Sequence, residues 1–279
     1  MSFEQEILSG ERFQFGENWS RFISVLNDER IKIAQDSLSS MLELPSLKNK
    51  SFLDIGSGSG LFSLCAYQLG ANVSSFDYDP NSVGCTQELK SRYCKDDSRW
   101  QVQQGSILDQ NFLDQISSEN NQFDIVYSWG VLHHTGSMWQ AIKNATTLVK
   151  PKGTFYLAIY NDQGIFSFIW KIIKKVYCLL PDVFKWIILF PTFVVMWLPK
   201  TIYDILRGKG LSRWREYHKS RGMSPWHDVV DWVGGYPFEV ATPAAIDKFL
   251  SDLGFEKRKV KPKGILHHGC CEYVYQRLV

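Results

Sequence analysis

The residues best suited to chemistry begin in a glycine-rich stretch from Leu53 to Gly60, where glycines alternate with serines behind an acidic residue. An apolar run precedes this stretch and apolar residues at helical spacing follow it, so the glycines lie where a strand turns into a helix. Gly56, Gly58 and Gly60 permit positive φ angles and place no side chain between main chain and ligand. The following helix N-terminus offers unpaired N–H groups. We therefore expect this turn, including Ser57, to bind a ligand.

The spacing of the glycines and the preceding acid narrow the choice of ligand. In the dinucleotide fingerprint G-x-G-x-x-G the third glycine comes one residue later, where this chain has Leu61. Asp54 would repel a pyrophosphate, whereas a carboxylate suits a ligand that carries a positive amine or sulfonium. The turn therefore favours a cationic, nucleoside-like ligand over a dinucleotide.

A second acidic residue, Asp77, follows Gly56 by twenty-one positions and ends a predicted strand at 73–77. A carboxylate at that place can accept hydrogen bonds from both ribose hydroxyls, as dinucleotide-binding folds also use it. Tyr78 follows directly and is assigned to the same site. Asp79 is expected to cap the next helix, at 80–93.

Three segments together carry a family resemblance. The D-x-G-x-G-x-G pattern that begins at Asp54 resembles motif I of the class I S-adenosylmethionine (SAM)-dependent methyltransferases. The segment from Phe123 to Thr135, F-D-I-V-Y-S-W-G-V-L-H-H-T, closely resembles the corresponding segment of ubiquinone-pathway-like, quinol methylase-type small-molecule methyltransferases. The turn at Gly105–Asp109 resembles the family's G-D-x-x-D segment. The likeness is good over roughly residues 50–160 and looser over 242–279.

The resemblance implies that SAM is the cofactor and that further residues contact it. Ser106 stands where the family has an acid near the adenine, and a hydroxyl there can still accept a weaker hydrogen bond. The resemblance also places Ile107, Ser128 and Trp129 in the cofactor site. Enzymes that methylate nucleobase or glutamine nitrogen carry Asn/Asp-Pro-Pro-Tyr after the fourth strand. That motif is absent here, so no nucleic-acid partner is expected.

Methyl transfer from a sulfonium needs mainly alignment and the exclusion of water, with a general base only for a hydroxyl or an acidic carbon. His133 and His134 follow the fourth predicted strand, near the expected methyl group, and either suits proton removal near neutral pH. The alternative is that one of them packs or caps a helix. His227, in an aromatic and acidic region, is a third candidate base. The acceptor is expected to be a small or lipophilic molecule, with oxygen favoured as the acceptor atom over carbon or nitrogen.

The alternation of predicted strands and helices indicates an α/β, Rossmann-like sheet of seven mostly parallel strands with helices on both faces. Five strands come first, with 154–160 apolar throughout and therefore central. A turn is expected at 151–153. A helix at 242–253 and an antiparallel hairpin at 255–260 and 271–278 close the sheet. The expected domains are an N-terminal helical lid (1–50), a SAM-binding domain (51–163 and 236–279), and a helical insertion capping the acceptor site (164–235).

The insertion is basic and apolar at the same time. Between residues 165 and 221 eleven lysines and arginines face three acidic residues. An uncharged run at 186–198 is shorter than the ~20 residues that span a bilayer, and Pro191 interrupts it. The spacing of apolar and basic residues at 166–176 predicts a basic amphipathic helix. One interpretation is a helical cap packed on the core; the other is a surface that touches anionic lipid or admits a greasy substrate.

Composition limits the remaining possibilities. The chain has 279 residues and a net charge of +2, which predicts no strong overall affinity for nucleic acid. Its six cysteines form no C-x-x-C pair, and the N-terminal residues lack a signal-peptide pattern. A reducing, cytoplasmic location is therefore expected, and peripheral contact with a membrane is a possibility left open. The run 267–271 matches no common zinc pattern, so no metal is expected. A nucleotide-cofactor dehydrogenase and a non-catalytic SAM-binding module are the alternatives to an enzyme of this family.

Overall fold

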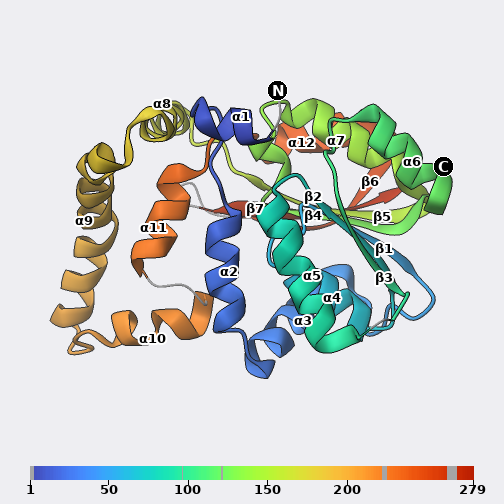
Figure 1. Cartoon of the computed structure of the whole chain (residues 1–279), viewed down its shortest axis with the longest axis horizontal. Coiled ribbons are helices and arrows are strands. Elements are labelled where there is room, and N and C mark those ends of the chain that lie inside the picture. The colour runs from blue at the N-terminus through green and yellow to red at the C-terminus, as the bar shows by residue number, and fades with distance from the viewer. Residues whose placement is uncertain (1–2, 96, 121, 222–224, 263–268) are drawn as a thin grey trace.

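A seven-stranded sheet lies at the centre of the computed structural model, which describes residues 3–95, 97–120, 122–221, 225–262 and 269–279 (Figure 1). The strand order is β3-β2-β1-β4-β5-β7-β6. β7 is antiparallel to both of its neighbours and the other pairs are parallel, so the predicted fold class is confirmed. The strands are β1 (Ser51–Ile55), β2 (Asn72–Asp77), β3 (Trp100–Gln104), β4 (Phe123–Trp129), β5 (Val149–Tyr160), β6 (Phe255–Lys261) and β7 (Cys270–Arg277).

Strand β5 is central, as its apolar sequence predicts, and lies between β4 and β7. It begins earlier than predicted, because Val149 already pairs with Phe123 of β4. The turn predicted at 151–153 is therefore wrong. The proline and glycine there produce an irregularity within the strand, where Lys152 adopts a φ of 61°.

Helices cover both faces of the sheet. On one face α3 (Asp28–Leu42), α4 (Leu61–Gln68) and α5 (Pro80–Cys94) pack on side chains such as Phe52 and Tyr127; on the other lie α6 (Gln110–Asn120), α7 (Met138–Thr147) and α12 (Pro243–Asp252). Asp79 caps α5 through the N–H of Asn81, as predicted, and Thr242 caps α12. These helices hold the strand ends, and hence the turns that follow them, at fixed positions.

The N-terminal part forms α1 (Phe3–Leu8) and α2 (Gly16–Ser24) before α3. Apolar residues at helical spacing between 23 and 44 belong to the end of α2 and to the whole of α3. The two helices are separate, because Asn27 accepts a hydrogen bond from the N–H of Arg30 and caps α3. In Figure 1 α2 stands between α5, on the sheet, and the insertion. The segment that ends in α2 therefore borders both halves of the molecule.

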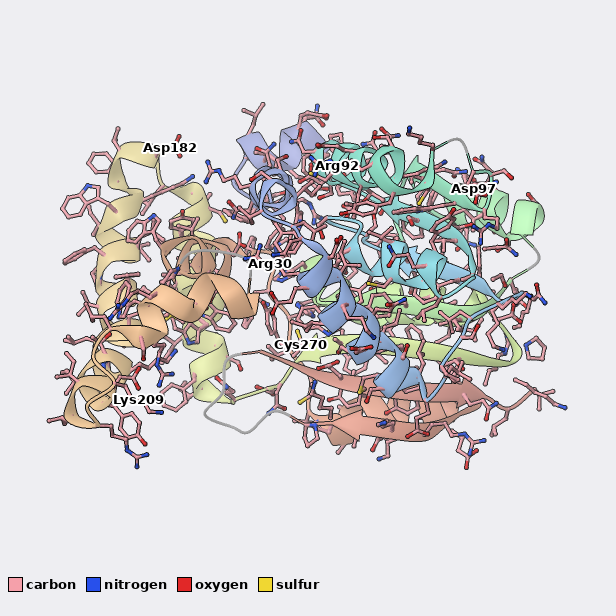
Figure 2. All side chains as sticks on the ribbon, turned by 90° about the horizontal axis from the view of Figure 1, so that it is seen from below. Arg30, Arg92, Asp97, Asp182, Lys209 and Cys270 are labelled. Atoms are coloured by element: carbon pink, nitrogen blue, oxygen red, sulfur yellow. The ribbon has the colours of Figure 1, made fainter. Side chains whose placement is uncertain are left out.

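The insertion between β5 and α12 consists of α8 (Ile165–Leu179), α9 (Asp182–Leu206), α10 (Ser212–Arg221) and α11 (Pro225–Gly234). It has an apolar cluster of its own that includes Tyr177, Trp197 and Val233. Figure 2 shows Asp182, at the start of α9, and Lys209, just past its end, on the side of the molecule away from the sheet.

Helix α9 differs from the sequence prediction, because it runs unbroken through Pro191 and Pro199. Each proline removes one backbone donor and crowds the carbonyl four residues before it, but the neighbouring turns continue the helix. Within the described residues α9 is the one helix long and apolar enough to cross a membrane, with a mean hydropathy of 1.5 over a window that is 11% buried.

Candidate functional site

The glycine turn lies against the end of β4, at the point where the strand order reverses. Gly56 has a φ of 75°, and a Cβ atom there would lie 2.4 Å from a methyl carbon of Val131. Only glycine therefore lets the turn after β1 meet the turn after β4. In open α/β sheets ligands bind in the crevice at such a switch point.

Asp77 is tied directly to the glycine turn. One carboxylate oxygen accepts from the N–H of Gly58 at 2.9 Å, and the other accepts from the N–H of Asp79, also at 2.9 Å. Burial raises the pKa of Asp77 to about 6, although these hydrogen bonds oppose the shift. Each oxygen keeps a further lone pair, so the carboxylate can still accept from two hydroxyls of a ligand.

Asp54 lies beneath the turn, with 2% of its surface exposed. Its carboxylate accepts a hydrogen bond from the hydroxyl of Ser63 on α4, and that hydroxyl also bonds Ser75 on β2. Burial, and secondarily the charge of Asp77, raise the pKa of Asp54 to about 7. This carboxylate therefore supports the turn through its hydrogen bonds and would act on a ligand through its electrostatic field.

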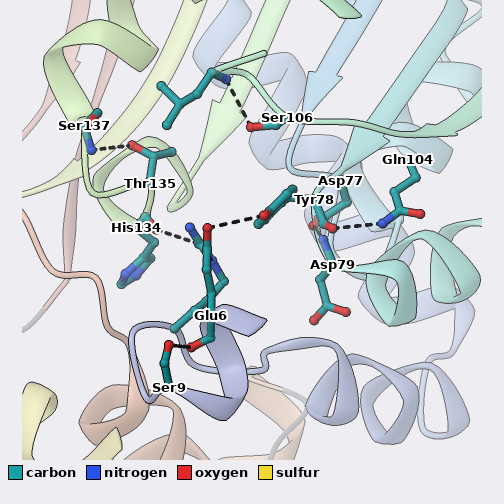
Figure 3. Close-up of polar contacts among 12 residues, drawn as sticks. Glu6, Ser9, Asp77, Tyr78, Asp79, Gln104, Ser106, His134, Thr135 and Ser137 are labelled. Atoms are coloured by element: carbon teal, nitrogen blue, oxygen red, sulfur yellow. Dashed lines mark hydrogen bonds and ion pairs between the residues drawn. The ribbon is translucent and has the colours of Figure 1, made fainter. Parts of the chain in front are cut away.

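The N-terminal segment closes over the turn. A Cβ atom on Gly58 would lie 3.1 Å from the indole nitrogen of Trp19 on α2. The hydroxyl of Tyr78 donates to Glu6 of α1 at 3.3 Å (Figure 3). Arg12 pairs with Glu6, lies 5.0 Å from the centre of the Tyr78 ring, and donates to the carbonyl of His134 at 2.9 Å. Arg12 thus links the end of β2 to the turn after β4.

The remaining predicted cofactor residues differ in their exposure. Ser106 is half-buried, and its hydroxyl accepts from the N–H of Leu108 at 3.2 Å (Figure 3). Ile107 is buried, and the hydroxyl of buried Ser128 donates to the carbonyl of Ile55 at 3.1 Å. Trp129 ends β4 and is 44% exposed. Ser128 therefore joins two strands through its side chain, whereas Trp129 presents its side chain to solvent.

Both predicted histidines are buried in the 3-10 turn η1 (Leu132–His134) after β4. The Nδ1 atom of His134 lies 2.6 Å from the carbonyl oxygen of Pro237, and its ring packs 5.1 Å from that of Phe15. Neither ring nitrogen of His133 has a hydrogen-bond partner within the described residues. Burial lowers the pKa of His134 to about 3 and that of His133 well below its usual range, so both rings are neutral at pH 7.

The insertion brings further polar side chains to these histidines. Lys174 of α8 is fully buried beside the rings of Trp232 and Phe238. Asp231 of α11 accepts a hydrogen bond from Asn18 of α2, and burial raises its pKa to about 7. Sequence patterns did not reveal Lys174, because it reads as one of several lysines on a solvated helix face; Asp231 belongs to the aromatic and acidic region that the sequence did single out. The aromatic density at 226–239 was the available signal. His227 lies on α11, but its side chain is outside the described residues.

Comparison with known proteins agrees with this geometry. A family model described as a methyltransferase domain matches residues 26–215. The chain belongs to this methyltransferase family. It is 24% identical, over 204 residues, to a ubiquinone biosynthesis O-methyltransferase of Coxiella burnetii, which covers 70% of each chain. A protein of the same name from Pseudomonas aeruginosa is 31% identical over 122 residues, covering 43% of this chain and 48% of that one.

Solved structures share the methyltransferase fold. Magnesium protoporphyrin IX methyltransferase from Synechocystis PCC 6803, crystallised with S-adenosylhomocysteine (SAH), has a TM-score of 0.54 at 14% identity, over 94% of each chain. A SAM-dependent methyltransferase from Anabaena variabilis also has a TM-score of 0.54, at 12% identity, over 95% of this chain and 93% of that one. The family model and the curated relatives make this protein a SAM-dependent methyltransferase, not a nucleotide-cofactor dehydrogenase.

The residues of this methyltransferase fit SAM chemically. Asp77 has unused lone pairs for ribose hydroxyls, and the carboxylate of Asp54 lies where a nearby positive charge would restore its ionised form. No cluster of three or more histidine, cysteine, aspartate or glutamate side chains suited to a metal occurs among the described residues. His267 and His268, which the sequence analysis weighed as ligands, lie outside the described part of the chain.

Proposed function

We propose that this methyltransferase methylates a hydroxyl oxygen of a small lipophilic molecule while its insertion rests on an anionic membrane. The observation that carries the proposal is the outward apolar face of α8 and α9. Names of relatives support the acceptor atom, since the proteins from Coxiella burnetii and Pseudomonas aeruginosa are both named O-methyltransferases.

The stripe predicted on α8 does not pack on the core. Most of its residues point outward, and α9 continues the same exposed apolar surface. We call this surface the outer face; it comprises Phe166, Phe168, Ile169, Ile172, Val176 and Leu179 of α8, and Val183, Phe184, Trp186, Ile187, Phe190, Val195 and Leu198 of α9, each at least 44% exposed. Exposed apolar patches of this extent mark protein or membrane contacts.

Charge favours a membrane as the partner. Lys171 and Lys175 are exposed on α8 beside the outer face, and Lys200 is exposed on α9. Basic residues flanking a face of tryptophan, phenylalanine and isoleucine are typical of helices that lie in the interface of anionic membranes.

The fold agrees better with α9 lying in the membrane–water interface than with α9 spanning the membrane. Its 25 residues would reach about 37 Å, enough to cross a bilayer. However, one side of α9 packs on α10 and α11, with Trp197 4.8 Å from the Trp214 ring and buried Asp204 paired with Arg213. Its two ends also connect to α8 and α10 of one folded unit (Figure 1). We therefore propose a peripheral enzyme, cytoplasmic in location, and not a spanning one.

The cofactor lies, in this proposal, over the glycine turn, with Asp77 on its ribose, Ser106 and Ile107 near its adenine, and the residues 1–50 as a lid. SAM supplies an already activated methyl group. The chain's own task is to align the acceptor oxygen and exclude water. Trp19 and Arg12 suit the second task, because they close the crevice from the N-terminal side.

The unpartnered ring of His133 suits the first task. A buried polar group without a hydrogen-bond partner costs free energy, which an acceptor hydroxyl would recover by bonding a ring nitrogen. The low pKa of both histidines argues that they hold the acceptor through hydrogen bonds and are poor proton acceptors. The aromatic rings of Tyr160, Trp232 and Phe238 would form the apolar part of this pocket.

The test combines membrane binding with acceptor identification. The purified protein should sediment with vesicles of phosphatidylglycerol and phosphatidylcholine but not with phosphatidylcholine alone. Trp186→Asp with Phe190→Asp should abolish this binding and leave SAM affinity unchanged. Ile33→Asp on α3, equally an exposed apolar position, is the matched control and should still sediment.

Methyl transfer from radiolabelled SAM should appear in the lipid extract of native membranes and resist mild base, as an ether does and an ester does not. Label confined to water-soluble products, or no sedimentation of the wild type, would refute the proposal. Point substitutions are preferable to removing residues 165–221, because that region also supplies buried side chains such as Lys174.

A further inference from the structure

Lys174 is the single buried lysine in the part of the chain that the structure describes. It lies on the inner side of α8, whose other side forms the outer face. Its Nζ atom lies 4.3 Å from the centre of the Trp232 ring and 4.8 Å from that of Phe238, and donates to the carbonyl of Trp232. Burying a lysine is costly, so a position enclosed by aromatic rings calls for an explanation.

Aromatic contacts connect Lys174 to the histidine pair. Tyr160, at the end of β5, has its ring centre 5.4 Å from that of Trp232 and 5.4 Å from that of Phe238. The same ring lies 4.1 Å from His133. The amine, these aromatic rings and the imidazole of His133 therefore form one cluster at the carboxyl ends of β4 and β5, the edge at which open α/β sheets bind ligands.

We propose that Lys174 is the catalytic base, taking the proton of the acceptor hydroxyl while His133 holds the oxygen. This inference rests on the proposed function and specifies it, since it assigns the acceptor site to a residue of the insertion. A phenol-like hydroxyl is the chemical class that suits an amine of this kind among aromatic rings.

The environment of the amine supports a base role. Burial lowers the pKa of Lys174 to about 7, which is near the optimum for proton transfer at neutral pH. Cys178, on α8, would oppose the shift only as a thiolate, and burial raises its pKa to about 11; Asp231, on α11, opposes the shift as a carboxylate. The buried rings of His133 and His134 face the amine from η1. Among the three basic groups of the cluster, the amine is thus the strongest proton acceptor.

The reaction balances without another reagent. The hydroxyl proton passes to the neutral amine of Lys174, giving an ammonium. The oxygen electron pair forms the bond to the methyl carbon as the carbon–sulfur bond breaks. The electron pair of that bond stays on sulfur, so the sulfonium becomes a neutral thioether. After product release, the ammonium returns its proton to solvent.

A purely structural lysine is the competing explanation, because its bond to the Trp232 carbonyl caps the last turn of α11. The two roles differ in what they predict for a bound phenol. A base lowers the pKa of a hydroxyl beside it by stabilising the anion, whereas a helix cap that does not face the acceptor leaves that pKa alone.

The experiment uses 4-nitrophenol as the probe, since its anion absorbs at longer wavelength than the neutral form. The full-length protein saturated with SAH is titrated with the probe at pH 6. In the wild type the bound probe should be at least about tenfold more ionised than in Lys174→Met and Lys174→Gln, the shift expected of an adjacent cation. Lys143→Met removes an exposed lysine of α7 and should match the wild type.

SAH affinity and melting temperature of each variant report whether it folds, and Lys174→Gln retains a polar group where methionine does not. Equal ionisation in the wild type and both variants overturns the proposal, and so does a failure of the wild type to bind the probe. If ionisation of the bound probe depends on Lys174 but the protein never binds vesicles, the base assignment is supported and the proposed lipophilic acceptor is refuted. If Lys174→Met forms methylated lipid as fast as the wild type does, the lipophilic acceptor is supported and the base assignment is refuted.

Discussion

Replacing Asp77 with asparagine tests the cofactor assignment most directly. In the structure the two carboxylate oxygens accept from the N–H groups of Gly58 and Asp79 and retain lone pairs toward the crevice. An asparagine keeps one acceptor oxygen and presents a donor in place of the other. At least one ribose hydroxyl would then lose a charged acceptor.

The magnitude follows from the bonds involved. A hydrogen bond to a charged group contributes about 1.5–3 kcal/mol, which corresponds to a roughly 10- to 150-fold weaker affinity. We expect Asp77→Asn to reduce SAM affinity within that range at pH 7.5. The catalytic rate at saturating SAM should change less, because a contact to the ribose stabilises bound SAM and the transition state alike.

The pH dependence supplies a second, independent signature. Burial raises the pKa of Asp77 to about 6 in the free protein, and ribose donors favour the ionised form. SAM affinity in the wild type should therefore rise from pH 5 through the pKa of about 6 of Asp77 and the pKa of about 7 of Asp54, and level off near about pH 8. The variant lacks the part of this pH dependence that comes from Asp77 and retains only the part that comes from Asp54, whose pKa is about 7. The difference between the two curves isolates Asp77.

Calorimetry or fluorescence titration can measure both effects, with Asp97→Asn as the matched control. Asp97 also accepts from the N–H two residues later, at 2.9 Å, but it lies before β3, at the opposite end of the strands. Adenosine and 2′,3′-dideoxyadenosine, as competitors, separate ribose recognition from distortion of the turn. If Asp77→Asn still discriminates between them as the wild type does, or binds SAM within threefold, the ribose assignment is wrong.

Three further outcomes follow from the same geometry. Gly56→Ala should destabilise the fold by about 2 kcal/mol or more and abolish SAM binding, because its Cβ would overlap Val131 at a φ of 75°. Gly84→Ala, in α5 with no atom within 4 Å of the new Cβ, should instead stabilise by about 0.5–1 kcal/mol, as denaturant unfolding can measure. Arg12→Met removes the link to the carbonyl of His134, so stopped-flow chase should show SAM leaving roughly tenfold faster; an unchanged rate would show that the N-terminal segment is not a lid.

The sequence by itself determined the sheet and the place of the glycine turn. Alternating apolar runs and turn residues are local signals, and they located β2, expected at 73–77, within one residue. The glycines behind Asp54 and the acid at Asp77 could be assigned because a strand end fixes where the next side chain lies. Caps such as Asp79 follow the same logic, since a cap depends on neighbours two or three residues away.

Only the tertiary structure decided what the insertion does with its residues. Hydropathy marked α8 as amphipathic, but a periodic pattern does not say whether its apolar side meets the core or the solvent. Packing against α11 turned that side outward and carried Lys174 inward, to the aromatic rings beside His133. Likewise, Arg12 meets the carbonyl of His134 from a position more than a hundred residues away. Such contacts depend on how elements far apart in the sequence are oriented, and no local stretch of residues determines that orientation.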